Sequence, residues 1–512
     1  MLVALVWFKW SFLALPFYWD EAWVYAPAVQ AMSITGPGLL PDALPVELSR
    51  GHPLLFHFLA STWASVFGTS SIALHAFALL VAGLLGVATY RLGALVGHPS
   101  LGLVALCLLL ANESFLAQSA ILLPELLLTL FLVLAVNSYL LKKQVTFVVF
   151  AVAALLTKET ALTLVVALFA SRTVDLVLAK DHTQRRTALQ GLGLAILPLA
   201  IAALFFVVQW FQRGWFFYPD HLGMMTYGWR DIIYKAKLIF QNVFEDQGIL
   251  PFTYAVAIVA PLVQRAVPVW KRLVTALLFV AAIKVLFGRW PMPEWGAVPF
   301  VLACLAAVHL LFLRPFKRVG GPAADLIEIC FLLVVAVWGF TSLNFYTDRY
   351  LVCLVPFVSV GGLAVLDKVL GVHWKWSAQL VGLCTAAYMV TQIGADGTVG
   401  DTKLAYRDGI AVHQRVVGHC IEQGWMDDPI SGSFMDVAYL TDSNAGYLPE
   451  GTTFRNVADR IDPTTVAAIV SYESSMERSE ELRAAGFVRS VRFEEGQAWA
   501  EVHVRQGAIP LP

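Results

Sequence analysis

The apolar residues of this chain recur in long runs from the N-terminus to about Gly394, and short polar or charged segments separate the runs. Runs of roughly 18 or more apolar residues are long enough to cross the hydrocarbon core of a bilayer as helices. A transmembrane β-barrel would show shorter segments in which apolar and polar residues alternate. The pattern therefore predicts an α-helical polytopic membrane protein, with about 13 transmembrane helices in a domain of residues 1–396.

Residues 401–512 show a different pattern, with shorter periodic segments among many charged residues. The spacing over residues 404–423 predicts an amphipathic helix. The stretches "AAIVSY" at 467–472 and "AWAEVHV" at 498–504 are typical of strands, and the segment between them predicts a helix that ends at Gly486. A small α/β domain outside the membrane is therefore expected at the C-terminus.

Loops rich in Lys and Arg usually face the cytoplasm, and such loops lie at residues 141–143, 179–186, 264–272 and 314–318. The loops between them then face outside: 19–53, 123–125, 158–159, 213–246, 288–294 and 344–349. The first extracytoplasmic loop region, residues 19–69, contains two segments of helical spacing that we expect to lie in the membrane interface. The C-terminal domain is expected on this same side.

Composition sharpens this division of the chain. Of all residues 58% are hydrophobic and 14% are charged, whereas a soluble domain usually has about 25% charged residues. From residue 401 onward there are 17 acidic and 10 basic residues, against 19 and 25 before it, so the two regions have opposite net charge. Five of six cysteines lie in apolar runs and Cys420 stands alone in the tail. No zinc-like Cys/His spacing and no nucleotide fingerprint occur, and nothing indicates a nucleic-acid partner.

The stretch "FYWDEAWVYA" places Asp20 and Glu21 directly after the first apolar run. Two acids there are typical of a helix that ends at the water interface before another begins. They also suit a general base beside an aromatic cleft, in which Trp23 and Tyr25 contact a sugar or a lipid. His52, in "RGHP", is either a further substrate contact or a packing residue.

Three more charged positions interrupt apolar runs on the same predicted side. Glu125, after Pro124, suits a helix start or a second carboxylate of a cavity. Lys158, in "LLTKETAL", is either an interfacial loop residue or a point charge for a phosphate. Arg349, in "TDRYLVCLVP", is either half of a surface Asp–Arg pair or a fork for phosphate oxygens. An ionisable residue at membrane depth is costly, so each is a candidate for function.

In this order the motifs resemble those of the GT-C glycosyltransferases that use polyprenyl-phosphate sugars. The nearest likeness is to bacterial relatives of the dolichyl-phosphate-mannose–protein mannosyltransferases and of the aminoarabinose transferase that modifies lipid A. The resemblance covers residues 10 to about 367. It is carried by "DEAWVYA", "HPLLFHFLASTWASVFGTSSIALHAFALL", "LLTKETAL" and "TDRYLVCLVP". His75 departs from the pattern where an Arg is common, and His52-Pro53 replaces the usual Pro-Pro.

The resemblance implies a role for each candidate residue. Asp20 would be the general base that acts on the acceptor, with Glu21 supporting it, and Glu125 stands where the family often has an Asp. Lys158 and Arg349, together with Tyr350, would bind the donor phosphate. Members of the family vary in metal use, so a divalent cation held by acids near the phosphate is compatible with the resemblance, although no spacing demands one.

We therefore expect a membrane glycosyltransferase that moves a monosaccharide from an undecaprenyl-phosphate-type donor to an extracytoplasmic protein, lipid or polysaccharide. A single base and no evident nucleophile pair predict inversion at the anomeric carbon. The expected location is a bacterial inner membrane, with lipid, donor and acceptor as partners and no certain cofactor. The alternatives are a transporter or flippase of lipid-linked sugars, which more often shows broken helices in paired halves, and a polysaccharide polymerase or ligase.

Overall fold

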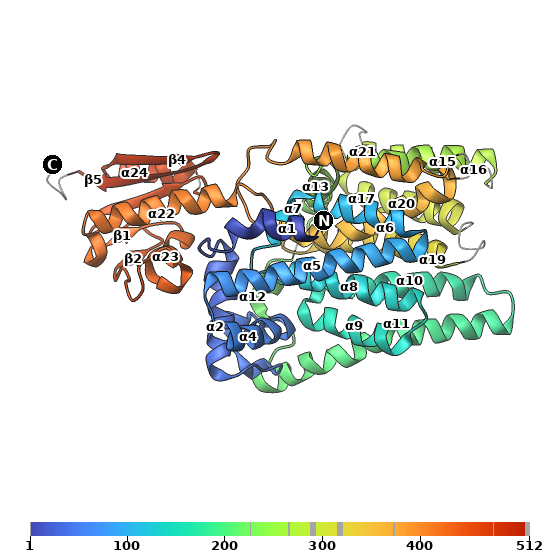
Figure 1. Ribbon diagram of the computed structural model, residues 1–512, viewed down its shortest axis with the longest axis horizontal. Coiled ribbons are helices and arrows are strands. Elements are labelled where there is room, and N and C mark those ends of the chain that lie inside the picture. The colour runs from blue at the N-terminus through green and yellow to red at the C-terminus, as the bar shows by residue number, and fades with distance from the viewer. Residues whose placement is uncertain are drawn as a thin grey trace.

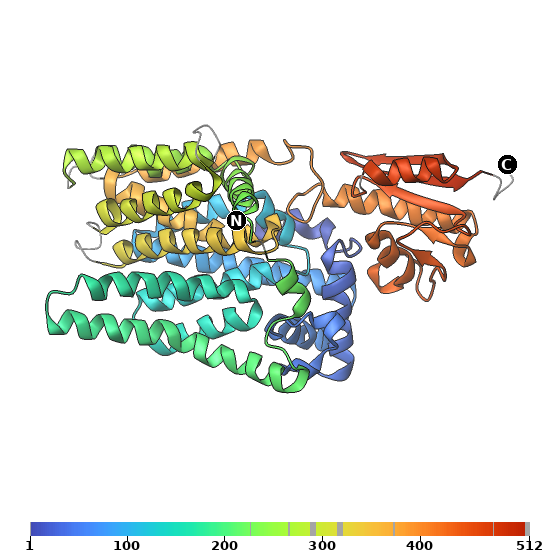
Figure 2. The ribbon, with the colours of Figure 1, turned by 180° about the vertical axis from the view of Figure 1, so that it is seen from behind.

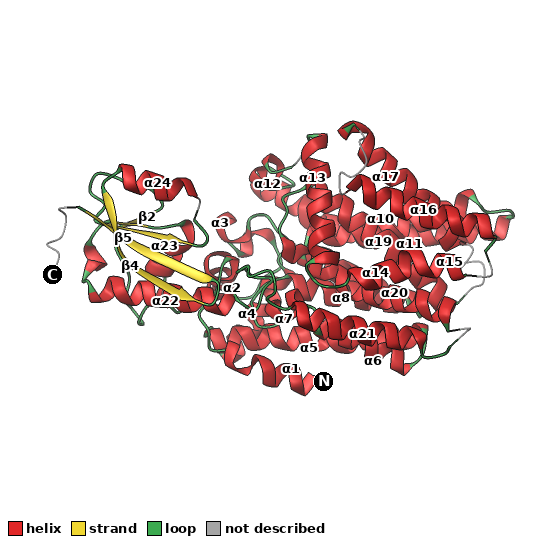
Figure 3. Ribbon diagram, turned by 90° about the horizontal axis from the view of Figure 1, so that it is seen from above, coloured by secondary structure: helices red, strands yellow, loops and turns green. Residues whose placement is uncertain are grey.

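The computed structural model describes residues 2–225, 227–264, 267–286, 293–314, 321–371, 374–474 and 476–506. Long helices run side by side in a bundle, and a small domain lies at one end of that bundle (Figure 1). Within the described residues, strands occur only in this C-terminal domain (Figure 3). The chain is thus a helical protein with a small C-terminal α/β domain, as the sequence predicts.

Six helical segments among the described residues are long and apolar enough to cross a membrane. One further pair, Trp229–Glu245 and Leu250–Val263, is bent by 102° and would make a seventh span if it crosses as one unit. The protein is therefore a multi-pass membrane protein. The six segments are Ser71–Val96, Glu159–Val177, His182–Arg213, Gly296–Leu313, Pro322–Leu343 and Asp348–Leu370.

The expected number of about 13 spans is not confirmed. Five apolar runs form helices of only 10–17 residues: Leu2–Phe12, Leu55–Phe67, Pro99–Leu110, Glu125–Leu140 and Gln144–Thr157. At about 1.5 Å per residue such helices are shorter than a hydrocarbon core of about 30 Å. The loops expected at 264–272, 288–294 and 314–318 lie partly outside the described residues.

Several short helices gather at the bundle end that faces the C-terminal domain, among them α2, α4 and α12 (Figure 1). This end also contains the first connecting region of the chain. The bounds of the helices before residue 400 are α1 (Leu2–Lys9), η1 (Trp10–Phe12), η2 (Glu21–Tyr25), α2 (Ala26–Thr35), η3 (Pro41–Ala43), α3 (Val46–Ser49), α4 (Leu55–Phe67), α5 (Ser71–Val96), α6 (Pro99–Leu110), α7 (Glu113–Gln118), α8 (Glu125–Leu140), α9 (Gln144–Thr157), η4 (Glu159–Ala161), α10 (Leu162–Val177), α11 (His182–Arg213), α12 (Pro219–Gly223), α13 (Trp229–Phe240), η5 (Gln241–Glu245), α14 (Leu250–Tyr254), η6 (Ala255–Val259), α15 (Ala260–Val263), α16 (Val269–Leu286), α17 (Glu294–Val308), η7 (His309–Leu313), α19 (Pro322–Leu343), η8 (Asp348–Leu354), α20 (Val355–Leu370) and α21 (Ser377–Gln392).

The connection between α10 and α11 lies at the opposite end of the bundle (Figure 2). Polar side chains join the helices near the loops expected to face the cytoplasm. Arg172 donates to the Tyr139 hydroxyl at 2.6 Å, and Arg314 donates to Asp175 at 2.6 Å. Buried ionisable groups are tolerated when they are paired. The predicted basic loops that are described therefore converge on one end, away from the C-terminal domain.

The C-terminal domain has a five-stranded sheet of order β2-β1-β3-β5-β4. The short strands pair in parallel, while β3, β5 and β4 are antiparallel neighbours. Strand β3 is buried along its whole length, whereas most of β4 is exposed. The elements are α22 (Tyr406–Glu422), η9 (Trp425–Asp427), β1 (Ile430–Ser431), α23 (Phe434–Thr441), η10 (Ser443–Ala445), β2 (Val457–Ala458), β3 (Ala467–Ser471), α24 (Met476–Ala484), β4 (Phe487–Glu495) and β5 (Ala498–Arg505).

The C-terminal domain binds the segment that follows the first helix. The amide of Phe17 donates to the carbonyl of Ala445 at 3.0 Å, and the hydroxyls of Tyr18 and Tyr472 lie 3.1 Å apart. Tyr18 is only 1% exposed, so this contact is part of a packed, buried interface. The domain therefore fixes the chain immediately before Asp20.

Candidate active site

Arg349, at the start of η8, is surrounded by three carboxylates from distant parts of the chain. Its Nη1 donates to Oδ2 of Asp401 at 2.7 Å, and its Nη2 donates to Oδ2 of Asp20. Its Nε lies 3.4 Å from Oε1 of Glu125. Asp20 precedes η2, Glu125 begins α8, and Asp401 lies in the linker between α21 and α22. The fold thus brings together three predicted site residues and adds one acid.

Lys158 extends this cluster from the junction of α9 and η4. Its Nζ donates to Oε1 of Glu125 at 2.6 Å and lies 3.7 Å from the centre of the Tyr350 ring. Glu125 is 1% exposed and Lys158 is 6% exposed. Because a charge so deeply buried is costly without a partner, each of these two side chains needs the other to remain charged in this position. The cluster therefore consists of three carboxylates and two cations.

Asp20 is held on both carboxylate oxygens. Besides Arg349, the indole Nε1 of Trp23 donates to Oδ1 at 2.9 Å, and the guanidinium of Arg50 lies 4.2 Å above the Trp23 ring. Trp19, just before Asp20, has φ of +54°, a left-handed conformation that bulky residues rarely adopt. The backbone here is therefore constrained to present Asp20 toward Arg349.

The pKa values of the two aspartates that share Arg349 are shifted in opposite directions. Burial opposes ionisation of Asp20, but the Arg349 guanidinium outweighs it and holds the pKa of Asp20 below its usual value. Burial raises the pKa of Asp401 although Arg349 opposes this, and the charge of Asp20 adds to the rise. Asp20 is therefore the firmly ionised member of the pair.

Glu21 has a different environment from its neighbour. Its carboxylate accepts from the amides of Leu122 at 2.6 Å and Tyr18 at 3.1 Å, and it lies 2.9 Å from Nε2 of His75. It is 1% exposed. These bonds tie η2 to α5 and to the segment that leads into α8. Glu21 therefore fixes the loop that carries Asp20, and His75, at the position where the sequence departs from the pattern, is its partner.

The other predicted contacts surround the cluster at different depths. Tyr25 is 6% exposed and packs edge-on against Phe56, with ring centres 5.6 Å apart. His52 lies 2.9 Å from Glu159 and faces the ring of His221 at 4.8 Å. His52 therefore belongs to a separate, more exposed pair that joins the first loop to η4.

Sequence reasoning missed two residues of this site, and both come from the tail. One is Asp401; the other is Phe434 of α23, whose ring lies edge-on to Trp19 and to Trp23 with centres 5.5 Å apart in each case. Only the position of Asp401 just after the last apolar run could have drawn attention to it. Phe434 is one aromatic residue among many, and no sequence signal marks it.

The carboxylates of the cluster are engaged by Arg349 and Lys158. Among the described residues, no three His, Cys, Asp or Glu side chains are grouped as a metal site. Asp20 and Asp401 bind Arg349, and Glu125 binds Lys158. A divalent cation would have to displace one of these two cations from its carboxylates.

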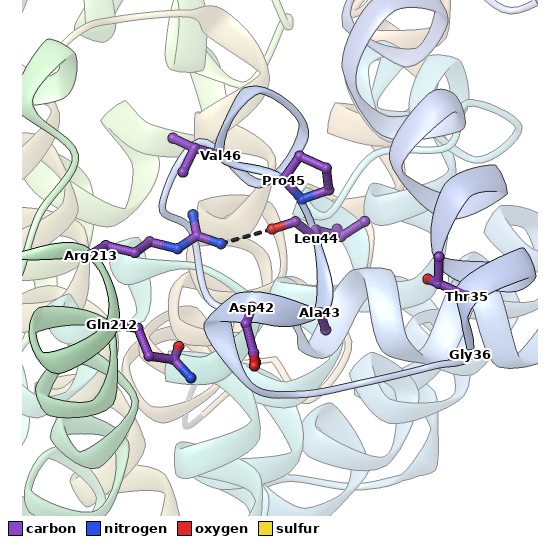
Figure 4. Close-up of a pocket in the computed structure, with 9 residues that line it drawn as sticks. All are labelled: Thr35, Gly36, Asp42, Ala43, Leu44, Pro45, Val46, Gln212 and Arg213. Atoms are coloured by element: carbon purple, nitrogen blue, oxygen red, sulfur yellow. Dashed lines mark hydrogen bonds between the residues drawn. The ribbon is translucent and has the colours of Figure 1, made fainter.

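Cavities of about 460, 590 and 270 Å³ are lined by described residues near the bundle end, and Asp20 lines none of them; the first lies between α13 and the segment before η8. The second, of about 590 Å³, is open and lies between the loop after α2 and the end of α11, where Arg213 donates to the Leu44 carbonyl (Figure 4). The third, of about 270 Å³, lies beside η8 and is lined by residues such as Asp348, Asp246 and Lys403. Asp348 accepts a hydrogen bond from Asn242, whereas Arg349 is buried and pairs with Asp20, Glu125 and Asp401.

Comparisons with known proteins complete this description. No protein-family model matches the chain, and no curated protein matches its sequence. Among solved structures, ArnT from Cupriavidus metallidurans bound to undecaprenyl phosphate is similar, with 13% identity and a TM-score of 0.47 over 100% of this chain and 98% of that one. The archaeal oligosaccharyltransferase AglB from Archaeoglobus fulgidus, in complex with an inhibitory peptide and a dolichol-phosphate, has 13% identity and a TM-score of 0.45 over 97% and 71%. Because both scores are below 0.5, the assignment of function depends on the site itself.

Proposed function

We propose that this protein is a membrane glycosyltransferase of the GT-C type. It transfers a monosaccharide from a polyprenyl-phosphate donor, of the undecaprenyl-phosphate kind, to an extracytoplasmic acceptor. The observation that carries the proposal is the buried ion pair between Asp20 and Arg349, which lies beside the Lys158–Glu125 pair. A base next to two cations is what transfer from a phosphate leaving group requires.

The proposed reaction uses each group at a stated atom. The acceptor hydroxyl or amine attacks the anomeric carbon, the bond from that carbon to the phosphate oxygen breaks, and Asp20 takes the acceptor proton. The polyprenyl phosphate leaves with the electron pair. Arg349 and Lys158 neutralise its charge, and the phosphate oxygens accept charge-assisted hydrogen bonds from the Arg349 guanidinium. A single displacement of this kind inverts the anomeric centre.

The ion pairs must rearrange for this chemistry. Asp20 is bound by both Arg349 and Trp23, and a carboxylate so engaged is a weak base. When a phosphate binds Arg349, its negative charge lies beside Asp20 and raises the proton affinity of that carboxylate, while Trp23 remains its orienting donor. The donor would therefore activate the base that later acts on the acceptor.

The supporting residues have roles in positioning. Glu21 holds the loop of Asp20, Glu125 orients Lys158, and the Tyr350 ring lies under the Lys158 ammonium. Tyr25 and Trp23 form aromatic walls near the charges. His52 lies farther out, where an acceptor would approach, and the steps proposed above use no cofactor or divalent cation.

The location follows from the distribution of charges. The described basic loops converge at the end of the bundle away from the C-terminal domain, which supports our proposal that this domain lies on the extracytoplasmic side of the membrane, a bacterial inner membrane in this proposal. The acceptor class, whether protein, lipid or polysaccharide, is set by the surface around Trp23 and the C-terminal domain.

A transporter of lipid-linked sugars is the second candidate, because the bent pair of helices at Trp229–Val263 resembles a broken span. One experiment separates the two. Purified protein in vesicles receives a panel of radiolabelled polyprenyl-phosphate monosaccharides with extracytoplasmic acceptors, and both transfer and movement across the bilayer are measured. The proposal expects transfer from at least one donor. Movement of the donor with no transfer would instead identify a flippase.

A further inference from the structure

Asp20 and Asp401 each accept a hydrogen bond from a terminal nitrogen of Arg349, and Asp20 is held more firmly than Asp401. Asp20 has Trp23 as a second partner and follows the constrained Trp19. Within the described residues, the carboxylate of Asp401 has one hydrogen-bond donor, Arg349. Asp401 also lies in an irregular linker, whereas Glu125 begins a packed helix. Asp401 is therefore the carboxylate that can leave Arg349 at the smallest structural cost.

The charges of the cluster favour the departure of one carboxylate when a phosphate arrives. In the empty site three carboxylates face two cations, Lys158 and Arg349. A donor phosphate would make four anions against the same two cations in a buried space. Like charges so close, with little water to screen them, destabilise one another strongly.

The geometry points to Asp401 as an internal anion that occupies the phosphate position of Arg349 in the empty enzyme and is displaced by the donor. This inference rests on the proposed function. In both states the buried guanidinium then has an anion on Nη1, which avoids an uncompensated charge. Asp401 is thus a gate on the donor site that is carried by the linker of the C-terminal domain.

Displacement of Asp401 would reach the C-terminal domain through the linker. Two residues later, Lys403 lies 3.6 Å from Glu113, and the amide of Leu404 donates to Glu113 at 3.2 Å. Tyr406 then begins α22 and packs against Tyr18, with ring centres 5.7 Å apart. A shift of Asp401 therefore loosens the same interface that fixes the chain before Asp20. Donor binding and the position of the C-terminal domain are coupled.

The test measures binding of undecaprenyl phosphate to the purified full-length protein in nanodiscs, without any acceptor. Asp401→Asn removes the competing charge and should tighten binding about tenfold, a usual size for coupling between sites. Asp396→Asn is the matched control, because Asp396 lies in the same linker and pairs with Lys403 rather than with Arg349. It should change the affinity less than twofold. Equal or weaker binding by Asp401→Asn would overturn the inference, since Asp401 would then orient Arg349 instead of competing for it.

A second measurement on the wild-type protein covers the case in which Asp401→Asn does not fold. Hydrogen exchange of the linker amides between α21 and α22 should rise when undecaprenyl phosphate is added. Unchanged or slower exchange there would contradict displacement. Arg349→Gln distinguishes the two proposals: it should abolish binding, and wild-type protein that binds no polyprenyl phosphate at all would overturn the proposed function together with the gate.

Discussion

The indole of Trp23 donates a hydrogen bond of 2.9 Å to the carboxylate of Asp20, three residues before it in the chain. The π-helix η2 begins at Glu21 and places these two side chains on one side. The same indole ring lies beneath Arg50 and beside Phe434. Trp23 thus joins the proposed base to the first loop and to the C-terminal domain.

Replacing Trp23 by Phe should keep the ring contacts and remove this hydrogen bond. A hydrogen bond to a charged group contributes about 1.5 kcal/mol, so we expect sugar transfer to slow about tenfold. The apparent unfolding temperature should change little. If transfer by Trp23→Phe remains at the wild-type rate, the indole does not orient Asp20.

Phe434→Ala tests whether the C-terminal domain takes part in the site. Loss of the ring between Trp19 and Trp23 should lower transfer severalfold, because the loop of Asp20 loses a wall that restricts it. Val488→Ala, an exposed position on β4, is the control and should leave the rate unchanged. Equal rates for both variants would show that the domain only covers the bundle end.

The Lys158–Glu125 pair should be required for stability as well as for donor binding. Lys158→Gln removes the nearer cation of the buried Glu125 and leaves it only Arg349 at 3.4 Å, and removing one partner of a buried pair costs about 3 kcal/mol or more. The double variant Glu125→Gln/Lys158→Gln should recover much of the loss, since no lone charge remains. Thermal unfolding in detergent measures both, and a double variant less stable than Lys158→Gln would contradict this account.

The C-terminal domain should show a stability maximum on the acid side of neutrality. His413 lies 3.2 Å from Asp436, and both are almost fully buried. Burial opposes the charge of His413, but Asp436 and Glu473 outweigh it and raise its pKa above 6.5. Asp436 has its pKa lowered below 3.8, because the His413 bond outweighs burial.

The two signs define the pH window. A raised His pKa adds stability that is complete below about pH 6.5 and is lost as the pH rises through the folded value. A lowered Asp pKa adds stability that is complete above about pH 4 and is lost as the pH falls through the folded value. The unfolding temperature should therefore peak between about pH 4 and pH 6.5. In His413→Gln the fall above this window should flatten; an unchanged alkaline slope would assign it to other groups.

The sequence predicted the charged cluster because membrane context makes charges conspicuous. Lys158, Glu125 and Arg349 each interrupt an apolar run, and burial at such positions requires partners. Which residues are partners could not be read in the same way. The pairing of Glu21 with His75, for example, depends on how α5 packs beside η2.

In the C-terminal region, still less of the structure could be predicted from the sequence. Asp401 is one acid among many in a charged region, and its contact with Arg349 depends on how the linker returns over the bundle. Strand β4 was not expected, because charged residues occupy its exposed face and hide the alternation of an edge strand. The predicted number of about 13 spans is not confirmed for a related reason: an apolar run predicts burial, but its composition alone does not give the length of the helix that forms.

The central claim is that Asp20 accepts the proton of the acceptor. It is tested most directly by single-turnover sugar transfer with Asp20→Asn and with Asp42→Asn, an exposed acid in the same first loop. Asp20→Asn should bind the donor yet transfer roughly 10²- to 10⁴-fold more slowly, the usual loss when a general base is removed, while Asp42→Asn should match the wild type. Transfer by folded Asp20→Asn at the wild-type rate would contradict the account.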